Sequence, residues 1–289
     1  MIKHNFITID EGLAQLMRID EVNPENSWVV PTGHEAARDM QLIGDGRLLV
    51  GHHNGYSEFD IATGKLLFDC NKYEGVTAAR RQPNGRTILA GVDFAGFEGA
   101  AILELDSEGK EIRSVQYEGD YVRLIRQTPQ GTILMSCNDR IREGDLEGNY
   151  LRDYPVEGFL HAWKALRLPN GNLLISAGYG AFMIELDSGG KIVRKFGGKE
   201  DVPESVNPFF YATFQLMPNG HIILANWQGH GPEMGESGIQ LLEFDVEEKI
   251  VWQWSESERI SSLQGLLVLD GLDISKLHDE REGIMKPIF

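Results

Sequence analysis

The sequence predicts an all-β fold, a six-bladed β-propeller with four-stranded blades, and two observations support this prediction. The first is a short turn phrase that recurs between apolar runs, with spacings of 39, 46, 40 and 49 residues between its glycines. Its copies are Ile43-Gly44-Asp45-Gly46, Gln82-Pro83-Asn84-Gly85, Thr128-Pro129-Gln130-Gly131, Leu168-Pro169-Asn170-Gly171 and Met217-Pro218-Asn219-Gly220. Such a phrase is typical of a tight β-hairpin, and a period of about 40 to 50 residues is typical of a propeller.

The two ends of the chain provide the second observation. Residues 262–271 resemble one more innermost strand, strand A, with its turn, but no strands B, C and D follow. Residues 5–10, 13–20 and 27–30 resemble strands B, C and D with no strand A before them. Joined, the two ends complete a sixth blade, which closes the ring and removes its exposed sheet edges.

The repeat therefore places every element in a single domain, 1–289. The expected blades are 32–70, 73–117, 119–154, 158–197, 207–255, and 260–271 together with 5–30. Strand C usually ends on an aspartate, as at Asp106, Asp187 and Asp245, which we expect to accept backbone N–H groups of the following turn. The tail, 274–289, reads as charged and irregular, with a short helix allowed at 275–281.

Composition excludes some classes of partner. The net charge is −17 and the isoelectric point about 4.9, which argue against nucleic acid and anionic membrane surfaces as partners. The chain contains no apolar run long enough for a membrane span and starts without a signal-peptide core. We therefore predict a cytoplasmic protein whose two cysteines, Cys70 and Cys137, are reduced.

One face of the predicted ring contains more variable loops and more histidines than the other. The A–B turns are short and alike, whereas the B–C loops and the D-to-A connections vary, and binding sites favour such loops. Five of the eight histidines map to the variable face: His34, His52, His53, His161 and His230. We predict acid–base roles for His161, His52 and His53, or a divalent metal held by His53, His161, His230 and Glu35. The alternative is loop histidines that only hydrogen-bond neighbouring turns.

Basic and aromatic side chains suggest the kind of ligand. Cations on innermost strands are unusual in a core, so they either bind a substrate anion in the channel or pair with acidic neighbours. Aromatic side chains on the variable face either stack on a sugar or flat ring or belong to the core between blades. The predicted substrate-binding residues are Arg38, Arg123, Lys164, Asn138, Tyr179, Tyr211 and Trp227.

The run from His161 to Ile175, HAWKALRLPNGNLLI, resembles the blade phrase of the arylsulfotransferase and quinoprotein-like propellers, as does the segment 185–193. The resemblance implies a propeller ring. For an arylsulfotransferase it also implies a histidine as transient sulfate carrier, for which His161 is the match, with Arg123 or Lys164 as oxyanion partners. The signatures of quinone-binding members are missing, and other small propellers, lactonases and sugar-acid lyases, bind a divalent metal at the channel mouth.

The leading hypothesis is an enzyme of lyase or hydrolase type that acts on a small, polar, anionic substrate, such as a sugar acid or lactone, at the channel mouth. A divalent metal is the one cofactor considered; no quinone or nucleotide is expected, since dinucleotide and phosphate-loop motifs are missing. One alternative is a non-enzymatic module that binds a protein or an oligosaccharide. A further alternative is sulfuryl transfer through His161.

Overall fold

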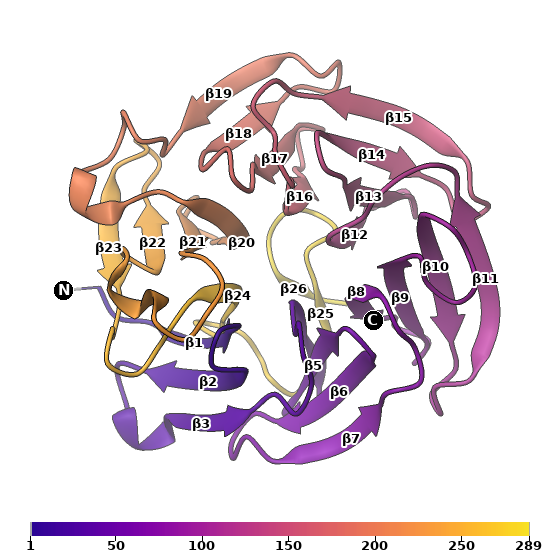
Figure 1. Cartoon of the computed structure of the whole chain (residues 1–289), viewed down its shortest axis with the longest axis horizontal. Helices are drawn as coiled ribbons and strands as arrows, with labels where there is room; N and C mark the ends of the chain where they lie inside the picture. The colour runs from indigo at the N-terminus through magenta and orange to yellow at the C-terminus, as the bar shows by residue number, and fades with distance from the viewer. Residues whose placement is uncertain (1, 289) are drawn as a thin grey trace.

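The computed structural model describes residues 2–288 and confirms a six-bladed β-propeller, six four-stranded antiparallel sheets in a ring (Figure 1). Helical structure is confined to short 3₁₀ turns, η1 (Pro24–Asn26), η2 (Glu204–Val206) and η3 (Met234–Glu236). Within the described residues, no helix has the length and apolar character needed to cross a membrane.

Five blades follow one another along the chain, each with its strands in sequence order from the channel outward. Blade 1 contains β4 (Asp39–Gly44), β5 (Arg47–His52), β6 (Gly55–Asp60) and β7 (Leu66–Cys70). Blade 2 contains β8 (Val76–Arg81), β9 (Thr87–Val92), β10 (Ala100–Leu105) and β11 (Glu111–Tyr117). Blade 3 contains β12 (Ile125–Gln127), β13 (Ile133–Ser136), β14 (Arg140–Gly144) and β15 (Tyr150–Pro155).

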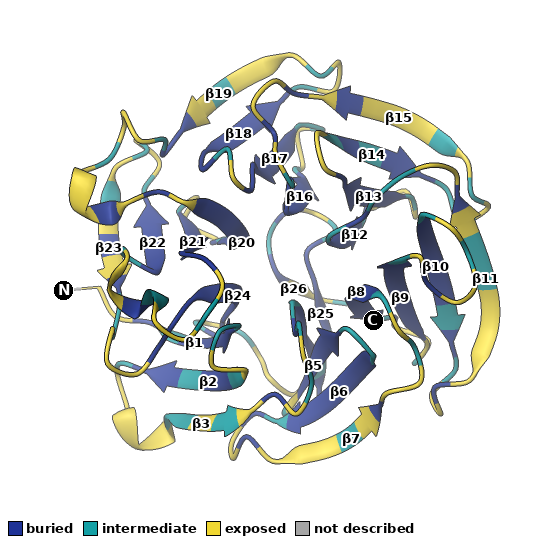
Figure 2. Cartoon of the chain, viewed as in Figure 1, coloured by how far each residue is buried: buried dark blue, intermediate teal, exposed yellow. Residues whose placement is uncertain are grey.

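Blades 4 and 5 repeat the same order. Blade 4 contains β16 (Lys164–Arg167), β17 (Leu173–Ser176), β18 (Met183–Leu186) and β19 (Ile192–Phe196). Blade 5 contains β20 (Phe210–Leu216), β21 (Ile222–Trp227), β22 (Leu241–Phe244) and β23 (Ile250–Trp254). Inner strands are buried on both faces, whereas outer strands such as β11, β15 and β19 are half exposed (Figure 2).

Blade 6 is built from both ends of the chain, as predicted. Strand β24 (Leu263–Val268) pairs with β1 (Asn5–Asp10), which is followed by β2 (Gln15–Asp20) and β3 (Trp28–Pro31). The fully buried Asp10 carboxylate accepts hydrogen bonds from the backbone N–H groups of Ser261, at 2.7 Å, and Ser262, at 3.2 Å. Both the strand ladder and this carboxylate therefore hold the ring closed.

The recurring turn residues act as the sequence predicts. Gly85, Gly131, Gly171 and Gly220 have φ angles of 80° to 87°, a region in which a side chain would be strained. On the C–D turn of blade 2, the Asp106 carboxylate accepts backbone N–H groups from two residues of the turn, each at 2.9 Å. The repeated turn sequences thus correspond to repeated local backbone conformations and hydrogen bonds.

The closing blade also contains a titratable contact. His4 is buried, with Nδ1 2.5 Å from Asp270 and Nε2 3.0 Å from Glu243. Burial opposes a charge on this ring, but the two carboxylates raise its pKa from 6.5 to about 9. The protonated ring therefore ties the segment that follows β24 to blade 5.

We expect this contact to make stability depend on pH in the alkaline range. Because the pKa of His4 is higher in the folded chain, its contribution is complete below pH 6.5 and is lost as pH rises through about 9. The free energy of unfolding should fall by about 3 kcal/mol over this range. Urea unfolding at each pH measures it, and the same slope in His4→Gln would contradict the assignment.

The C-terminal tail is the main departure from the expected fold. It forms no helix at 275–281; instead β25 (His278–Asp279) pairs with β26 (Lys286–Pro287). Backbone bridges join Leu277 to Ile43 on β4 and Ile284 to Leu216 at the end of β20, so the extended tail crosses the ring from blade 1 to blade 5 (Figure 1). Extended backbone can pair with both inner strands, which a helix of that length could not do.

The tail inserts a carboxylate among the channel cations. Lys164 Nζ donates to Glu280 Oε1 at 2.6 Å, and Arg126 Nε donates to Glu280 Oε2 at 2.9 Å. Arg126 also donates to Asp39 at 2.9 Å, and Arg80 lies 3.7 Å from the same carboxylate. All five side chains are at most 3% exposed. Of the two alternatives for the basic inner strands, pairing with acidic side chains therefore holds for this group.

Candidate functional site

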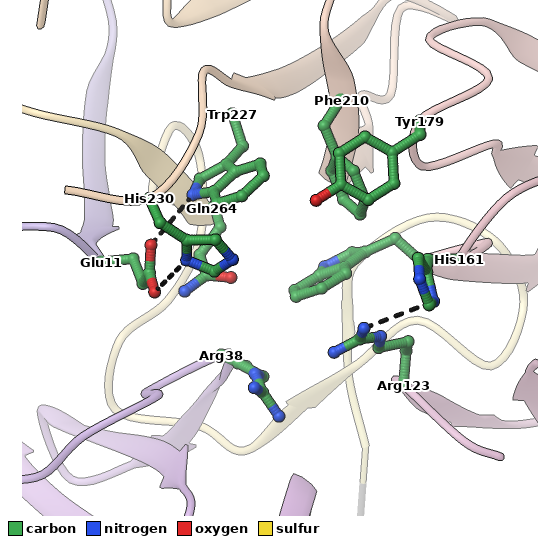
Figure 3. A pocket seen from close by; sticks show the side chains of 10 residues that line it. Glu11, Arg38, Arg123, His161, Tyr179, Phe210, Trp227, His230 and Gln264 are labelled. Atoms are coloured by element: carbon green, nitrogen blue, oxygen red, sulfur yellow. Dashed lines mark hydrogen bonds and ion pairs between the residues drawn. The ribbon is translucent and has the colours of Figure 1, made fainter. Parts of the chain in front are cut away.

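A cavity of about 330 Å³ lies at the channel mouth, on the face formed by B–C loops and D-to-A connections (Figure 3). Five of the six blades supply its lining: Glu11, Arg38, Arg123, His161, Trp163, Tyr179, Phe210, Trp227, His230 and Gln264. Glu11 and His230 lie on one side of the cavity, and His161 and Arg123 on the other. The site therefore depends on the closed ring, because distant parts of the chain meet only there.

Two arginines face this cavity without carboxylate partners. Arg38 immediately precedes β4, and Arg123 precedes β12. Among the described residues, neither guanidinium lies within ion-pair distance of an acidic side chain, and the buried Arg123 Nε lacks a hydrogen-bond partner. Burial lowers the pKa of both groups, and the charge of Arg38 contributes to the lowering at Arg123. Two partly desolvated cations of this kind suit an anionic ligand with two oxygens.

His161 is held by a tight local backbone arrangement. Its φ angle is 56°, in the left-handed region that few side chains adopt. Gly178, at the end of the B strand of the same blade, makes room for it, since an added Cβ would lie 2.1 Å from the His161 carbonyl oxygen. The Tyr179 N–H donates to the Leu160 carbonyl at 2.9 Å. These contacts fix the imidazole at the rim of the cavity.

The surroundings of His161 keep its imidazole neutral. Burial, and then the neighbouring charge of Arg123, lower its pKa below the usual 6.5. Its Nδ1 lies 2.6 Å from the Asn138 side-chain oxygen and 3.4 Å from Arg123 Nη2. A proton on Nδ1 satisfies Asn138 and leaves Nε2 as the basic nitrogen. The residue can therefore accept a proton at neutral pH.

A second imidazole is paired with a carboxylate. His230 Nδ1 lies 2.9 Å from Glu11 Oε1, and Trp227 Nε1 donates to Glu11 Oε2 at 3.3 Å. The carboxylate orients the ring, as in the histidine–carboxylate pairs of acid–base enzymes. The cavity thus contains two imidazoles with different partners, one beside an amide and an arginine and one beside a carboxylate.

Aromatic side chains form the wall between the two imidazoles. Tyr179 packs edge-on against Phe210, with ring centroids 4.7 Å apart, and Phe210 packs against Trp163 and Trp227 at 5.4 Å each. Tyr179 is 38% exposed, so one ring face remains available at the mouth. This wall suits a ligand that has a ring or another flat apolar part.

The structure brings six predicted site residues to this cavity and separates the others. Arg38, Arg123, His161, Tyr179, Trp227 and His230 line it, and Asn138 contacts His161. Lys164 lies instead with Glu280, and the fully buried Tyr211 donates its hydroxyl to the Gly197 carbonyl. His52 lies inside blade 1, 2% exposed.

The predicted metal set is not assembled. His53 lies outside this cavity with Nε2 3.9 Å from the Glu74 carboxylate, and Glu35 lines a separate, smaller cavity. His161 and His230 do share the channel-mouth cavity, but each contacts a different partner. The two residues that were expected to complete the ligand set therefore belong to other surroundings.

Sequence reasoning did not include Glu11 or Gln264 in the site. Glu11 follows β1, and in a ring closed by the N-terminal strands the β1–β2 turn is a B–C loop of the sixth blade. That assignment was enough to place Glu11 on the variable face. Gln264 lies on β24 and has no comparable signal, because one amide on an apolar strand is also common in cores.

Comparison with known proteins supports the fold. No family model and no curated protein matches the chain. Among solved structures, a protein of unknown function from Bacteroides caccae matches with a TM-score of 0.75 and 23% identity, over 92% of this chain and 99% of that one. A streptogramin B lyase matches with a TM-score of 0.60 and 12% identity, over 98% and 93%.

A catalytically inactive histidine-to-alanine variant of virginiamycin B lyase from Staphylococcus aureus, with quinupristin, matches with a TM-score of 0.59 and 10% identity, over 92% of each chain. At these identities the three likenesses show the propeller fold and no activity. None of the three is named an arylsulfotransferase, and that resemblance stays a prediction.

Proposed function

We propose that this protein is an acid–base enzyme of lyase or hydrolase type that acts on a small carboxylate-bearing molecule, such as a sugar acid or lactone, at the channel mouth. The observation that carries the proposal is the pair of arginines without carboxylate partners, Arg38 and Arg123, in one cavity with two imidazoles in different surroundings. The lyase names of two fold neighbours make elimination the first chemistry to test.

In this mechanism the arginines hold the substrate carboxylate and stabilise the negative charge that develops beside it. His161 Nε2 removes a proton, from the carbon next to the carboxylate in an elimination or from water in a hydrolysis. The protonated His230, held by Glu11, donates a proton to the leaving oxygen, so the proton count balances. The aromatic wall holds the remainder of the substrate.

We expect His161→Asn to lower kcat by about 10²- to 10⁴-fold, because it removes the base. Asparagine tolerates the left-handed backbone at this position, so the fold should be retained. The assay is a panel of anionic lactones and uronic-acid esters, followed by proton release for hydrolysis and by ultraviolet absorbance of the unsaturated acid for elimination.

The arginine variants complete this test. Arg38→Gln and Arg123→Gln should raise KM for carboxylate substrates. Arg86 lies on an A–B turn, where it pairs with Glu104, so Arg86→Gln should leave KM unchanged. Wild-type turnover that is unchanged in His161→Asn would exclude the proposed base. Sulfate esters belong in the same panel, because sulfuryl transfer through His161 would use the same arginines.

A non-enzymatic binding module is the second candidate, and one observation favours it. Three large apolar side chains next to the cavity are exposed: Leu160 by 56%, Phe209 by 40% and Tyr179 by 38%. Such a rim suits a protein or oligosaccharide as well as a small ring. A protein that binds a ligand with equal affinity in wild type and His161→Asn, and turns over nothing in the panel, would support this candidate.

A further inference from the structure

A second cluster of ligating side chains lies in blade 1, outside the channel-mouth cavity. His34 Nε2 lies 2.8 Å from Asp69 Oδ1, and His52 Nε2 lies 3.7 Å from the same oxygen. The two imidazoles stack with centroids 3.8 Å apart and planes 12° apart. One ligand atom from each of the three residues lies within 4.8 Å of the others.

A fourth potential ligand atom, a hydroxyl oxygen, lies beside the cluster. Ser57 Oγ donates to Asp69 Oδ1 at 2.8 Å and lies 3.2 Å from His52 Nε2. Two ligand atoms that share a zinc ion at about 2.0–2.2 Å each are separated by about 3–4 Å. The separations of His34 and His52 from Asp69 fall close to this range, but the two stacked rings must rotate apart to share one ion, because a metal lies in the plane of each imidazole that binds it.

The chemistry of the ligands selects the kind of metal. Two imidazoles and one carboxylate suit a divalent transition metal such as zinc, and suit magnesium or calcium poorly, since these prefer oxygen ligands. His52 is buried, so its ring is shielded from bulk solvent.

The cluster has a route for an ion to enter. His34 lines a cavity of about 230 Å³, which also contains Glu11 and Glu35, and the Asp69 side chain is 30% exposed. Glu11 also lines the channel-mouth cavity, so the two cavities are neighbours. The acidic side chains on this route favour a cation over an anion.

We propose that His34, His52 and Asp69, with Ser57 or water as a further ligand, form a binding site for a divalent transition metal, zinc in the first place. His34 lies on the connection from β3 to β4, whereas His52 and Asp69 lie on β5 and β7. A bound ion would therefore tie the closing blade to blade 1. This site is separate from the proposed acid–base residues, and its test does not depend on their activity.

The test is a calorimetric titration of Zn²⁺ into untagged, chelator-treated protein, in excess Ca²⁺ to occupy surface carboxylates. We expect one Zn²⁺ per chain, a higher melting temperature, and a visible absorption band when Co²⁺ replaces Zn²⁺. His34→Asn, His52→Asn and Asp69→Asn should each weaken zinc binding at least about tenfold. Each variant must first show a cooperative unfolding transition without metal.

Two matched controls make the result specific. His230→Asn removes another histidine–carboxylate pair, with a 2.9 Å separation, and His53→Ala removes the histidine next to His52. Both should bind zinc as the wild type does. Zinc binding that is missing from the wild type, or that is equal in wild type and all three cluster variants, would overturn the proposal and leave a hydrogen-bonded structural cluster.

Discussion

Glu280→Ala is expected to lower the free energy of unfolding by about 3–5 kcal/mol, because it removes one partner from a buried ionic cluster. The substitution would leave the buried Lys164 without an acidic partner and Arg126 with Asp39 alone, since Glu280 accepts from both cations and is 1% exposed. Urea unfolding measures the loss, provided that the dependence of the unfolding free energy on urea concentration is the same in both proteins.

A matched control lies two residues further along the chain. Glu282 pairs with Lys286 at 3.1 Å, but both side chains are more than half exposed. Glu282→Ala should therefore change stability by less than about 1 kcal/mol. Glu280→Gln, which keeps the shape and one acceptor, should be intermediate. Equal losses in Glu280→Ala and Glu282→Ala would show that the cluster contributes nothing specific.

A chain that ends at residue 259 is expected to lose its cooperative unfolding transition. It lacks β24, so the backbone edge of β1 that pairs with β24 would be exposed to water. The core would also lose Leu263, Leu267 and Val268, which are at most 1% exposed in the full chain. Propeller closure involves every blade, so the whole ring should be destabilised. Circular dichroism during urea unfolding provides the measurement.

Two further chains separate ring closure from the tail. A chain that ends at residue 272 keeps β24 and Asp270 but lacks Glu280, so it should still unfold cooperatively, at lower urea. A peptide of residues 260–289, added to the chain that ends at 259, should restore the transition. If the chain ending at 259 unfolds at the same urea concentration as the full chain, the ends do not close the ring.

The ring itself was predictable because its evidence is local and repeated. Each Asn-Gly or similar turn requires a positive φ angle, and the structure has one at Gly85, Gly131, Gly171 and Gly220. The shared blade followed from counting which strands were missing at each end. Repetition made these signals stronger than those of any single turn.

The site was only partly predictable, because its members meet through contacts that have no local signal. Glu11 and His230 are 219 residues apart, and Glu280 pairs with Arg126 over 154 residues. The sequence placed His34 and His52 on the variable face, but Asp69 lies on an outer strand, where a carboxylate is ordinary. The tail supplies Glu280, which neutralises Lys164 and contacts Arg126. The tail does not belong to the repeat, so the repeat gave no means of predicting these contacts.

The tail also determines how molecules exchange with the channel. Glu280, Lys164 and Arg126 are at most 3% exposed, so bulk solvent does not reach this cluster from either face of the ring. We therefore expect the channel-mouth cavity to have one opening, so that a ligand that enters past Tyr179 leaves by the same route. If the reaction yields two products, the deeper one departs second and blocks the next substrate, which would make it a competitive inhibitor.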